Sequence, residues 1–379
     1  MQINDFVRRM QNPGGARRMS RSVHVDLILF LLLFLLCGFG LAVLYSASGE
    51  DLFYVKRQLM FMITGFVLML SVAQVSVRSM HRWAFVVYGL GLVALLAVLI
   101  FGVGAKGAQR WLDLGFTRLQ PAEIMKVCVP LMISAYLSKR FIPPTFKHVC
   151  WSVVMILIPT LLIVRQPDLG TAILVFASGF LVLFLAGLGK RYILGSGLIS
   201  LAAIPVMWLF VLRDYQKQRI LTLLSPEDDT LGSGWNIIQS KTAIGSGGFN
   251  GKGWTEGTQS QLSFLPESHT DFIIAVLAEE FGLIGVMALC TLYLLIIGRC
   301  LFIAANAQSQ FGRLLAGSLG SIFFIYIFVN MGMVSGILPV VGAPLPMISY
   351  GGTAILTLFI GFGMLMAISR EPKQMRTQF

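Results

Sequence analysis

The run "VDLILFLLLFLLCGFGLAVLY" (residues 25–45) decides the fold class, because Asp26 is its only charged residue. A helix needs ~20 predominantly apolar residues to cross the hydrocarbon core of a bilayer. The apolar part is longer than the ~7–15 residues found in a cleaved signal peptide. We therefore predict that this run is an uncleaved first membrane span.

The composition of the whole chain agrees with that prediction. Of 379 residues, 56% are hydrophobic and 12% are charged, whereas about 25% of residues are charged in an ordinary soluble protein. Apolar runs predict spans at roughly 26–46, 58–78, 83–103, 122–140, 150–164, 168–188, 192–212, 272–298, 312–335 and 351–369. The predicted class is an all-α polytopic membrane protein with about ten transmembrane helices.

The polar segments divide the chain into three parts. Residues 1–25 form a basic tail that we expect to be flexible, 26–369 form a single ten-helix transmembrane domain, and 370–379 form a second tail. Residues 213–270 form the only long segment between predicted spans. Long loops in compact bundles are usually functional, so we expect chemistry on the face where this segment lies.

Lysine and arginine are distributed unevenly between the two faces of the predicted bundle. They are concentrated in the N-terminal tail, in alternate short loops and in the C-terminal tail. Positive residues favour the cytoplasmic side, so we predict cytoplasmic termini, an outer segment 213–270 and a location in the cytoplasmic (inner) membrane. The net charge of +12 is then mostly a topology signal with some attraction for anionic lipid. We expect no nucleic-acid partner.

Cysteine and histidine offer no metal site. The five cysteines lie in or beside predicted spans without a CxxC pair, and the four histidines are scattered. We interpret the cysteines as small apolar packing residues.

The stretch "FLPESHTDFIIAVLAEEFG" (264–282) places acids beside an apolar helix. Acids at membrane depth are rare and usually functional, although Asp271 could also cap the helix that follows it. At 100° per residue, Glu279 lies about 80° from Asp271 and could share a groove with it. Glu280 lies on the opposite side and needs a different partner.

The stretch "QRWLDLGFTRLQPAEIMK" (109–126) contains a charged pair at an expected helix start. Pro121 suits the first turn of a helix, and Glu123 and Lys126 share one face of that helix. Two interpretations stay open. The pair neutralises a helix end that enters lipid, or it lines a cavity at the outer membrane surface.

Two further stretches break the helical pattern. "AIGSGGFNGKGW" (243–254) fits no phosphate-loop pattern; it is either a turn that glycine permits or a loop whose amides and Lys252 contact an anionic substrate. "SGILPVVGAPLPMISYGG" (335–352) contains three prolines in an apolar setting. It predicts a re-entrant segment that is buried in protein or lines a cavity.

These residues together resemble the SEDS family (shape, elongation, division and sporulation proteins), from the first span to about residue 369. The motifs are "KGAQRWLDLG", "QPAEIMK", "RQPDLGTA", "YQKQRI", "GSGWNIIQSKTAIGSGG", "GKGWTEGTQSQLSFLPESHTDFI", "LAEEFGLIG" and "SGILPVVGAPLPMISYGGT". "GTQSQLSFLPE" is more similar to the elongation branch than to the division branch. Ala122 stands where the family often has Ser, a conservative departure.

The resemblance implies a peptidoglycan glycosyltransferase that polymerises lipid II at the outer face of the cytoplasmic membrane, for cell elongation and rod shape. The family's catalytic Asp matches Asp271, its charged pair matches Glu123 and Lys126, and the Trp of its first outer motif matches Trp111. The implied partners are a class B penicillin-binding protein (a transpeptidase) docked against the later spans, and other membrane proteins of the elongation complex.

The residue types suit that chemistry. A single inverting displacement on a sugar pyrophosphate needs one base and positive charge on the leaving group. We expect Asp271 to be the base. The candidate cations for the pyrophosphate are Lys126, Arg110, Arg219, Lys241 and Lys252. A divalent cation, Mg²⁺ or Mn²⁺, could assist, although no set of metal ligands is visible.

Two functions of other classes remain as alternatives. A lipid II flippase would place polar groups along a path through the membrane, whereas the predicted polar groups cluster at the outer mouth. A non-catalytic scaffold of the cell-wall synthesis complex would not need Asp271 beside the Glu123–Lys126 pair.

Overall fold

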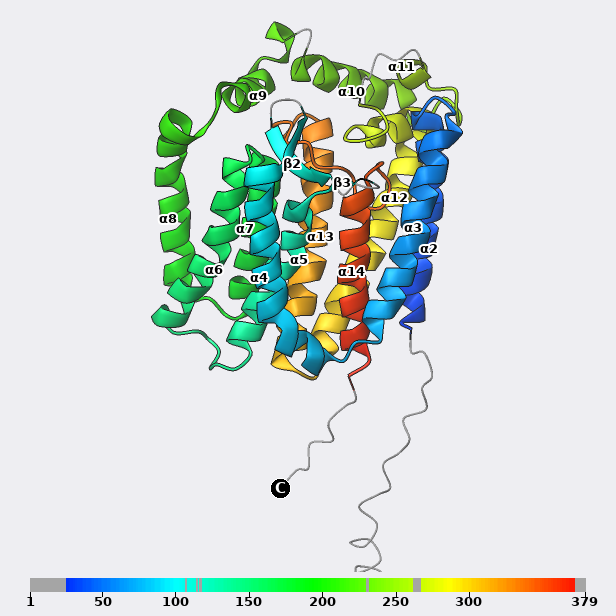
Figure 1. Ribbon diagram of the computed structural model, residues 1–379. Helices are drawn as coiled ribbons and strands as arrows, with labels where there is room; N and C mark the ends of the chain where they lie inside the picture. The colour runs from blue at the N-terminus through cyan, green and yellow to red at the C-terminus, as the bar shows by residue number, and fades with distance from the viewer. Residues whose placement is uncertain are drawn as a thin grey trace, which may run out of the picture.

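The computed structural model describes residues 25–105, 108–113, 115, 118–229, 232–261 and 267–371. Apolar helices stand side by side in a bundle, and the start of α2 and the end of α14 lie at the same end of it (Figure 1). The bundle helices are α2 (Leu27–Ala47), α3 (Leu52–Ala73), α4 (Val77–Phe101), α5 (Pro121–Leu137), α6 (Phe146–Arg165), α7 (Leu169–Leu185), α8 (Lys190–Val206), α12 (Ile273–Asn306), α13 (Gln310–Val334) and α14 (Gly352–Ser369). The all-α polytopic class is confirmed.

The bundle helices differ in length and in burial. Within the described residues, eight helices are long and apolar enough to cross a membrane, and α7 is a shorter apolar helix of 17 residues. Helix α5 also has 17 residues and is buried along nearly its whole length. It packs against α4, α6, α7, α13 and α14, so its charged pair lies inside the bundle and away from lipid.

Helix α8 differs from the rest of the bundle. It is apolar enough to span a membrane, and none of its residues is buried. It stands at the edge of the bundle and continues into a short π-helical turn, Met207–Val211 (Figure 1).

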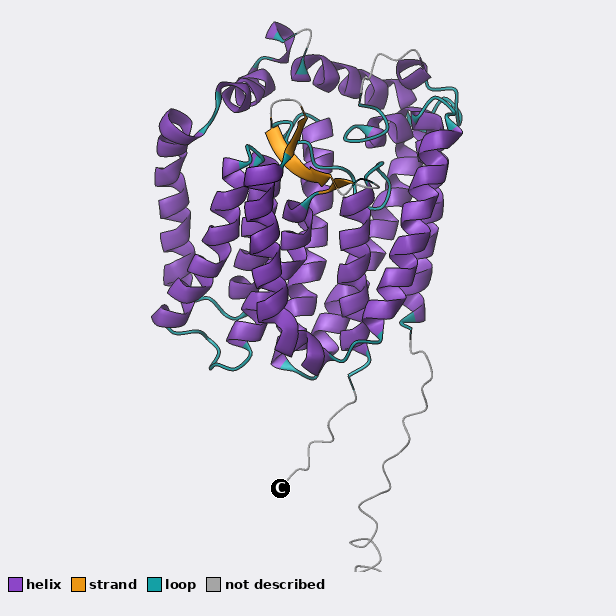
Figure 2. Cartoon of the chain, in the orientation of Figure 1, coloured by secondary structure: helices purple, strands orange, loops and turns teal. Residues whose placement is uncertain are grey.

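The segment between α4 and α5 forms a small antiparallel sheet that was not predicted. Its strands are β1 (Val103–Ala105), β2 (Ala108–Asp113) and β3 (Arg118–Leu119), in the order β1-β2-β3. Figure 2 shows these strands at the end of the bundle opposite the start of α2. Pairing satisfies backbone groups where the chain leaves the helices, and short strands between spans carry little hydrophobic signal.

The long segment 213–270 contains helices where only a long loop was predicted. They are α9 (Asp214–Leu224), a 3₁₀ turn (Pro226–Asp228), α10 (Ser233–Gly247) and α11 (Thr258–Gln261). Figure 1 shows α9, α10 and α11 across the same end of the bundle as the sheet. The expected glycine turn follows α10, with positive φ at Gly248, Gly251 and Gly253.

The re-entrant segment is confirmed. Between α13 and α14 the chain enters the protein without a helix, and Leu345, Met347 and Ile348 are buried. The Tyr293 hydroxyl donates to the Pro346 carbonyl at 2.7 Å. The Gln58 amide donates to the Ser349 carbonyl at 2.9 Å. Side chains of the bundle therefore satisfy backbone groups of the broken segment, as membrane depth requires.

Candidate active site

Helix α5 carries the charged pair one turn inside its N-terminus. Pro121 is its first residue, and Glu123 lies in the first turn, where a carboxylate is favoured by the helix dipole. The Lys126 Nζ lies 2.6 Å from the Glu123 Oε2, and both side chains are buried. The two charges therefore neutralise each other within one helix.

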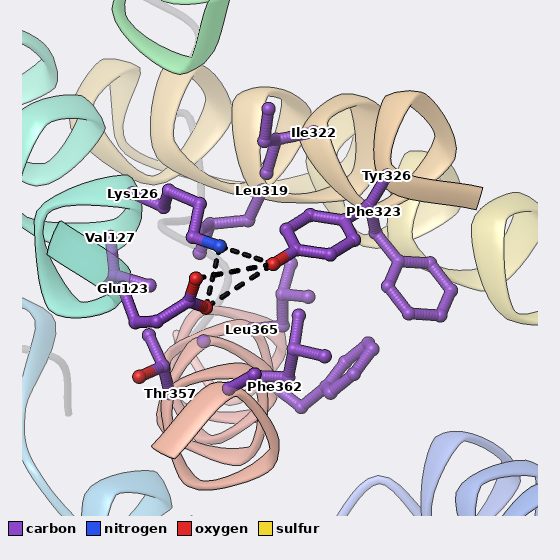
Figure 3. A pocket seen from close by; sticks show the side chains of 13 residues that line it. Glu123, Lys126, Val127, Leu319, Ile322, Phe323, Tyr326, Thr357, Phe362 and Leu365 are labelled. Atoms are coloured by element: carbon purple, nitrogen blue, oxygen red, sulfur yellow. Dashed lines mark hydrogen bonds and ion pairs between the residues drawn. The ribbon is translucent and has the colours of Figure 1, made fainter. Parts of the chain in front are cut away.

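Tyr326 of α13 completes this cluster, and the sequence pattern did not indicate it. Its hydroxyl accepts a hydrogen bond from Lys126 Nζ and donates to Glu123 Oε2 at 3.3 Å. The ammonium also lies 4.2 Å from the centre of the Tyr326 ring. Figure 3 shows the three polar groups converging from α5 and α13. A buried tyrosine hydroxyl needs a partner, but sequence alone does not say which partner is near.

The cluster lines a small cavity whose remaining walls are apolar except for Thr357. Residues of α13 and α14, among them Leu319, Phe362 and Leu365, complete its lining (Figure 3). Its volume is about 40 Å³, and a buried water needs ~10–15 Å³. The cavity has room for a few water molecules and none for a sugar. The Glu123–Lys126 pair thus lines a cavity among α5, α13 and α14 and does not lie at a helix end exposed to lipid.

Arg110 belongs to a second cluster, at the turn between α6 and α7. Its Nη2 donates to the Pro167 carbonyl at 2.7 Å, and its Nε lies 3.7 Å from Asp168 Oδ2. The Gln120 amide donates to Asp168 Oδ2 at 3.0 Å. Asp168 therefore joins strand β2 to the residue that precedes α5. In the sequence Asp168 stood out only as part of the motif "RQPDLGTA".

Asp271 lies beside the re-entrant segment and does not begin a helix. Helix α12 starts at Ile273, its N-cap residue is Phe272, and no side chain caps it. The capping interpretation is therefore replaced by a turn before the helix. The Asn330 amide donates to the Asp271 carbonyl at 2.9 Å and to the Ala343 carbonyl at 2.7 Å.

The carboxylate of Asp271 reaches the re-entrant segment at a glycine. A β-carbon added at Gly342 would stand 3.5 Å from Asp271 Oδ2, and Gly342 has a φ of 74°. Asn330, which donates to the Asp271 carbonyl, lies one turn after Tyr326 on α13. Asp271 and the cluster of Glu123, Lys126 and Tyr326 therefore contact the same helix.

Glu279 does not share a groove with Asp271, and that expectation is corrected. Its carboxylate lies 2.7 Å from Lys252 Nζ and accepts from Thr258 Oγ1 and the Gln259 backbone N–H at 3.0 Å each. Glu280 has the separate partner that its position requires, because it accepts a hydrogen bond from the Ser46 hydroxyl.

His269 stands in an aromatic cluster next to Asp271. Its ring lies 4.9 Å from that of Tyr54, which meets the Tyr350 ring at 5.3 Å. The Tyr350 backbone N–H donates to the His269 carbonyl at 3.0 Å. Burial lowers the pKa of His269 below its usual value, while the Glu267 carboxylate acts in the opposite direction. The imidazole is therefore neutral at pH 7.

A larger cleft opens at the same end of the molecule. It measures about 770 Å³, which is the size of a small-molecule site. Its lining residues are Arg57, Phe61, Trp111, Asp113, Gly115, Arg118, Tyr350, Gly351, Gly352 and Thr353. Trp111 therefore faces this cleft and is absent from the lining of the small cavity. Arg57 was not among the predicted site residues, so its place here was missed.

The three candidate substrate cations of the long outer segment, Arg219, Lys241 and Lys252, do not form one cluster. Arg219 Nη1 donates to the Val340 carbonyl at 3.1 Å. A β-carbon at Gly336 would stand 2.6 Å from Lys241 Nζ, so Arg219 and Lys241 both border the re-entrant segment. Lys252 is paired with Glu279, and its contact with an anionic substrate stays a prediction.

Metal ligands do not gather in the described part of the chain. No group of three or more His, Cys, Asp or Glu side chains there could hold a metal ion. A role for Mg²⁺ or Mn²⁺ stays a prediction.

Fold and site together define an integral membrane protein whose polar site opens at one end of the bundle, where the headgroup of a lipid-anchored substrate would lie. A family model described as a cell cycle protein, FtsW/RodA/SpoVE, matches residues 26–374. The chain belongs to this family, which is the SEDS family that its motifs resemble.

Relatives cover nearly the whole chain. Peptidoglycan glycosyltransferase MrdB of Escherichia coli K12 is 52% identical over 353 residues, covering 93% of this chain and 95% of that protein. The probable peptidoglycan glycosyltransferase FtsW of Trichlorobacter lovleyi is 38% identical over 374 residues, covering 93% and 95%.

Solved structures show the same architecture. A chain from work on the structural coordination of polymerization and crosslinking by a peptidoglycan synthase complex matches with a TM-score of 0.80 and 30% identity, covering 91% of this chain and 98% of that one. The crystal structure of the Thermus thermophilus rod shape determining protein RodA matches with a TM-score of 0.71 and 28% identity, covering 92% and 98%.

Proposed function

We propose that this chain polymerises lipid II into glycan strands at the outer face of the cytoplasmic membrane, for cell elongation and rod shape. Its 52% identity to a peptidoglycan glycosyltransferase over nearly the full length of both chains supports the enzyme class. One observation carries the assignment of the site. The Asp271 carboxylate lies against Gly342 of the re-entrant segment, and the Asp271 carbonyl is held by Asn330 of α13, the helix that also carries Tyr326.

Asp271 serves as the general base in this proposal. The donor sugar is held by an α-linked pyrophosphate, which is a good leaving group without a general acid, unlike the leaving groups of glycosidases. The Asp271 carboxylate takes the proton of the acceptor 4-hydroxyl while that oxygen bonds to the donor anomeric carbon. The bond from this carbon to the pyrophosphate oxygen breaks, and the pyrophosphate leaves with the electron pair. The configuration inverts.

Fixed cations stabilise the departing pyrophosphate. Arg57 and Arg118 line the outer cleft, and guanidinium groups bind phosphate oxygens in a bidentate manner. Charges that are already in place where negative charge develops lower the barrier. Arg219 and Lys241 border the re-entrant segment and can add positive potential. Trp111 and Tyr350 offer aromatic faces to the sugar rings.

Two charged groups act on Asp271 from inside the bundle. Lys126 is enclosed by Glu123 and Tyr326, and Arg110 is tied to Asp168. In this proposal both cations act through the groups beside them, setting the electrostatic environment of Asp271. A divalent cation fits only in part, because Mg²⁺ is commonly held by one or two carboxylates and substrate phosphates. The carboxylates that could supply that share are Asp271 beside the re-entrant segment and Asp113 in the cleft.

We also propose a class B penicillin-binding protein as the partner, docked between α12 and α13, with other membrane proteins of the elongation complex beyond it. An apolar groove of about 440 Å³ runs between these helices. It is lined by Cys290, Leu294, Ile297, Phe324 and Phe328, among others. Such a surface suits one apolar membrane helix. A related chain comes from a peptidoglycan synthase complex that coordinates polymerization and crosslinking.

Polymerisation by Asp271→Asn protein tests the proposal. Asn keeps the size of the side chain and cannot accept the hydroxyl proton, so we expect synthesis to fall by ~10²–10⁴-fold. The measurement is glycan formation from lipid II by purified, monodisperse protein with its transpeptidase present. Near-normal product would remove Asp271 from the mechanism.

The small cavity also bears on the flippase alternative. A flippase needs a polar path, whereas this cavity holds about 40 Å³ and its walls include Leu319, Phe323 and Leu365. The test is to place the protein in vesicles that contain lipid II, under conditions in which no polymerisation takes place. Movement of lipid II from one leaflet to the other would support the flippase alternative.

A further inference from the structure

Helix α12 is interrupted at Gly282. This residue has φ 62° and ψ −161°, values outside the helical region. The outer part, Ile273 to Phe281, follows directly after Asp271, and the longer part continues to Asn306. A break in a helix leaves backbone donors and acceptors without helical partners. These groups need partners from elsewhere.

The loop after α10 supplies those partners through four backbone hydrogen bonds. The N–H groups of Lys252 and Gly253 donate to the carbonyls of Glu279 and Glu280, each at 3.0 Å. In return, Leu283 N–H donates to the Gly248 carbonyl at 3.0 Å, and Ile284 N–H donates to the Phe249 carbonyl at 3.3 Å. The loop therefore bonds to both sides of the break.

A side-chain network locks the same junction. The Lys252 ammonium lies 2.7 Å from Glu279 Oε1 and donates to the Thr258 hydroxyl at 2.7 Å. Glu279 is fully buried and also accepts from the Gln259 backbone N–H at 3.0 Å. Residues from α11, the loop and α12 thus share one carboxylate. A buried carboxylate with a cation and several donors is well held, and removing the cation leaves it uncompensated.

Close backbone contact requires glycine on both sides of this junction. A β-carbon at Gly247 would overlap the Ala278 carbonyl oxygen, and one at Gly251 would overlap that of Glu280. A β-carbon at Gly282 would overlap the Gly251 nitrogen. The glycine-rich stretch is therefore explained by contact with α12, and no anionic ligand is needed to account for it.

We propose that residues 247–259 form a clasp that positions Asp271 by fixing the outer part of α12. The proposal rests on the role of Asp271 as the base. The clasp holds this part of α12 at its inner end, while Asn330 holds it at the Asp271 carbonyl. Lys252 and Glu279 are positioning residues in this account, because they touch α12 and α11 and act on the chemistry through Asp271. A displacement of ~1 Å at a reacting group costs ~10²-fold in rate.

The test compares Lys252→Met with Lys252→Arg and with a control at the other end of α12. We expect Lys252→Met to lower kcat by about 10- to 100-fold with little change in KM, and Lys252→Arg to restore most of it. Arg299→Met is the matched control. Arg299 Nη2 lies 2.8 Å from Asp26 Oδ2 in a comparable ion pair on the same helix, so its loss should leave kcat near that of the unmodified protein.

Hydrogen exchange gives a readout that a general loss of stability would not produce. In Lys252→Met protein we expect faster amide exchange in residues 267–281 and unchanged exchange in 284–306. If Lys252→Met does not fold, Thr258→Ala removes one hydroxyl from the network and should lower kcat by about 2- to 10-fold with the same exchange pattern.

Asp271→Asn, assayed in parallel, separates the two proposals. If Asp271→Asn abolishes synthesis while Lys252→Met or Thr258→Ala keeps normal kcat and normal exchange, the clasp is overturned and the base stands. If Asp271→Asn keeps its activity, the base itself is wrong, and the clasp loses the residue that it was proposed to position.

Discussion

Lys126 and Glu123 carry opposite charges inside the bundle, and each depends on the other. Lys126→Met leaves the Glu123 carboxylate buried without its cation, so we expect a loss of ~3–5 kcal/mol in the free energy of unfolding. Replacing both residues by Met removes the uncompensated charge and should recover most of that stability. The measurement is thermal unfolding in detergent, with polymerisation assayed on the same samples.

The double variant also separates stability from function. If the pair sets the electrostatic environment of Asp271, the stable Glu123→Met, Lys126→Met protein should remain poorly active. Normal glycan synthesis by that protein would show that the pair serves insertion and packing alone.

His269 predicts the direction of a pH effect. Because burial lowers the pKa of His269 in the folded protein, the unfolded chain binds more protons below the usual histidine pKa of ~6.5. The contribution of this group to stability is therefore complete above that pH and decreases as the pH falls through the lowered value. Unfolding temperature measured from pH 7 to pH 5 should drop less for His269→Gln than for the unmodified protein. An equal decrease in the unfolding temperature of both proteins would show that His269 does not cause this pH dependence.

At the scale of elements, the groove between α12 and α13 is the surface that we assign to the transpeptidase. Changing Phe324 and Phe328 to Ala removes two aromatic side chains that line it. We expect weaker co-purification of the penicillin-binding protein and less stimulation of polymerisation by it. Phe85→Ala on α4 is the matched control, since Phe85 is 71% exposed and lies outside this groove. Equal effects of both changes would exclude the groove.

The positions of the spanning helices could be predicted because apolar run length is a local property. The sheet could not, since strands of three, six and two residues have no room for a recognisable alternation. Helices α9 and α10 were missed for a related reason. The segment is polar enough to resemble a loop, and its helices are short.

Site residues could be predicted where their charge differs from the apolar sequence around them. Asp271, Glu123 and Lys126 stood out as charges beside apolar runs. Tyr326 and Asp168 did not, because their roles come from contacts across 200 and 48 residues of sequence. The pairing of Lys252 with Glu279 could not be predicted either, because the two residues lie 27 positions apart in the chain and spacing alone does not show that their side chains meet.

At the scale of the whole molecule, the sidedness of the bundle remains the main prediction from charge. In a cysteine-free variant, single cysteines at positions 52, 115 and 230 should react with an impermeant reagent added to intact cells; position 230 lies outside the described residues. Cysteines at positions 145 and 307 should react only after the membrane is opened. Labelling at position 145 in intact cells would reverse the topology and place the cleft on the side away from its substrate.

The length of chain between Lys126 and Tyr326 has a consequence during synthesis. Tyr326, whose hydroxyl completes the cluster, is translated 200 residues after Lys126. At ~5–20 residues per second this is a delay of about 10–40 s. Helix α5 must therefore enter the bilayer before α13 exists. Because Glu123 lies one turn from Lys126 on the same helix, the two charges can neutralise each other as soon as that helix forms. The nascent α5 can then remain in the bilayer with its charges neutralised until α13 is synthesised and Tyr326 joins the cluster.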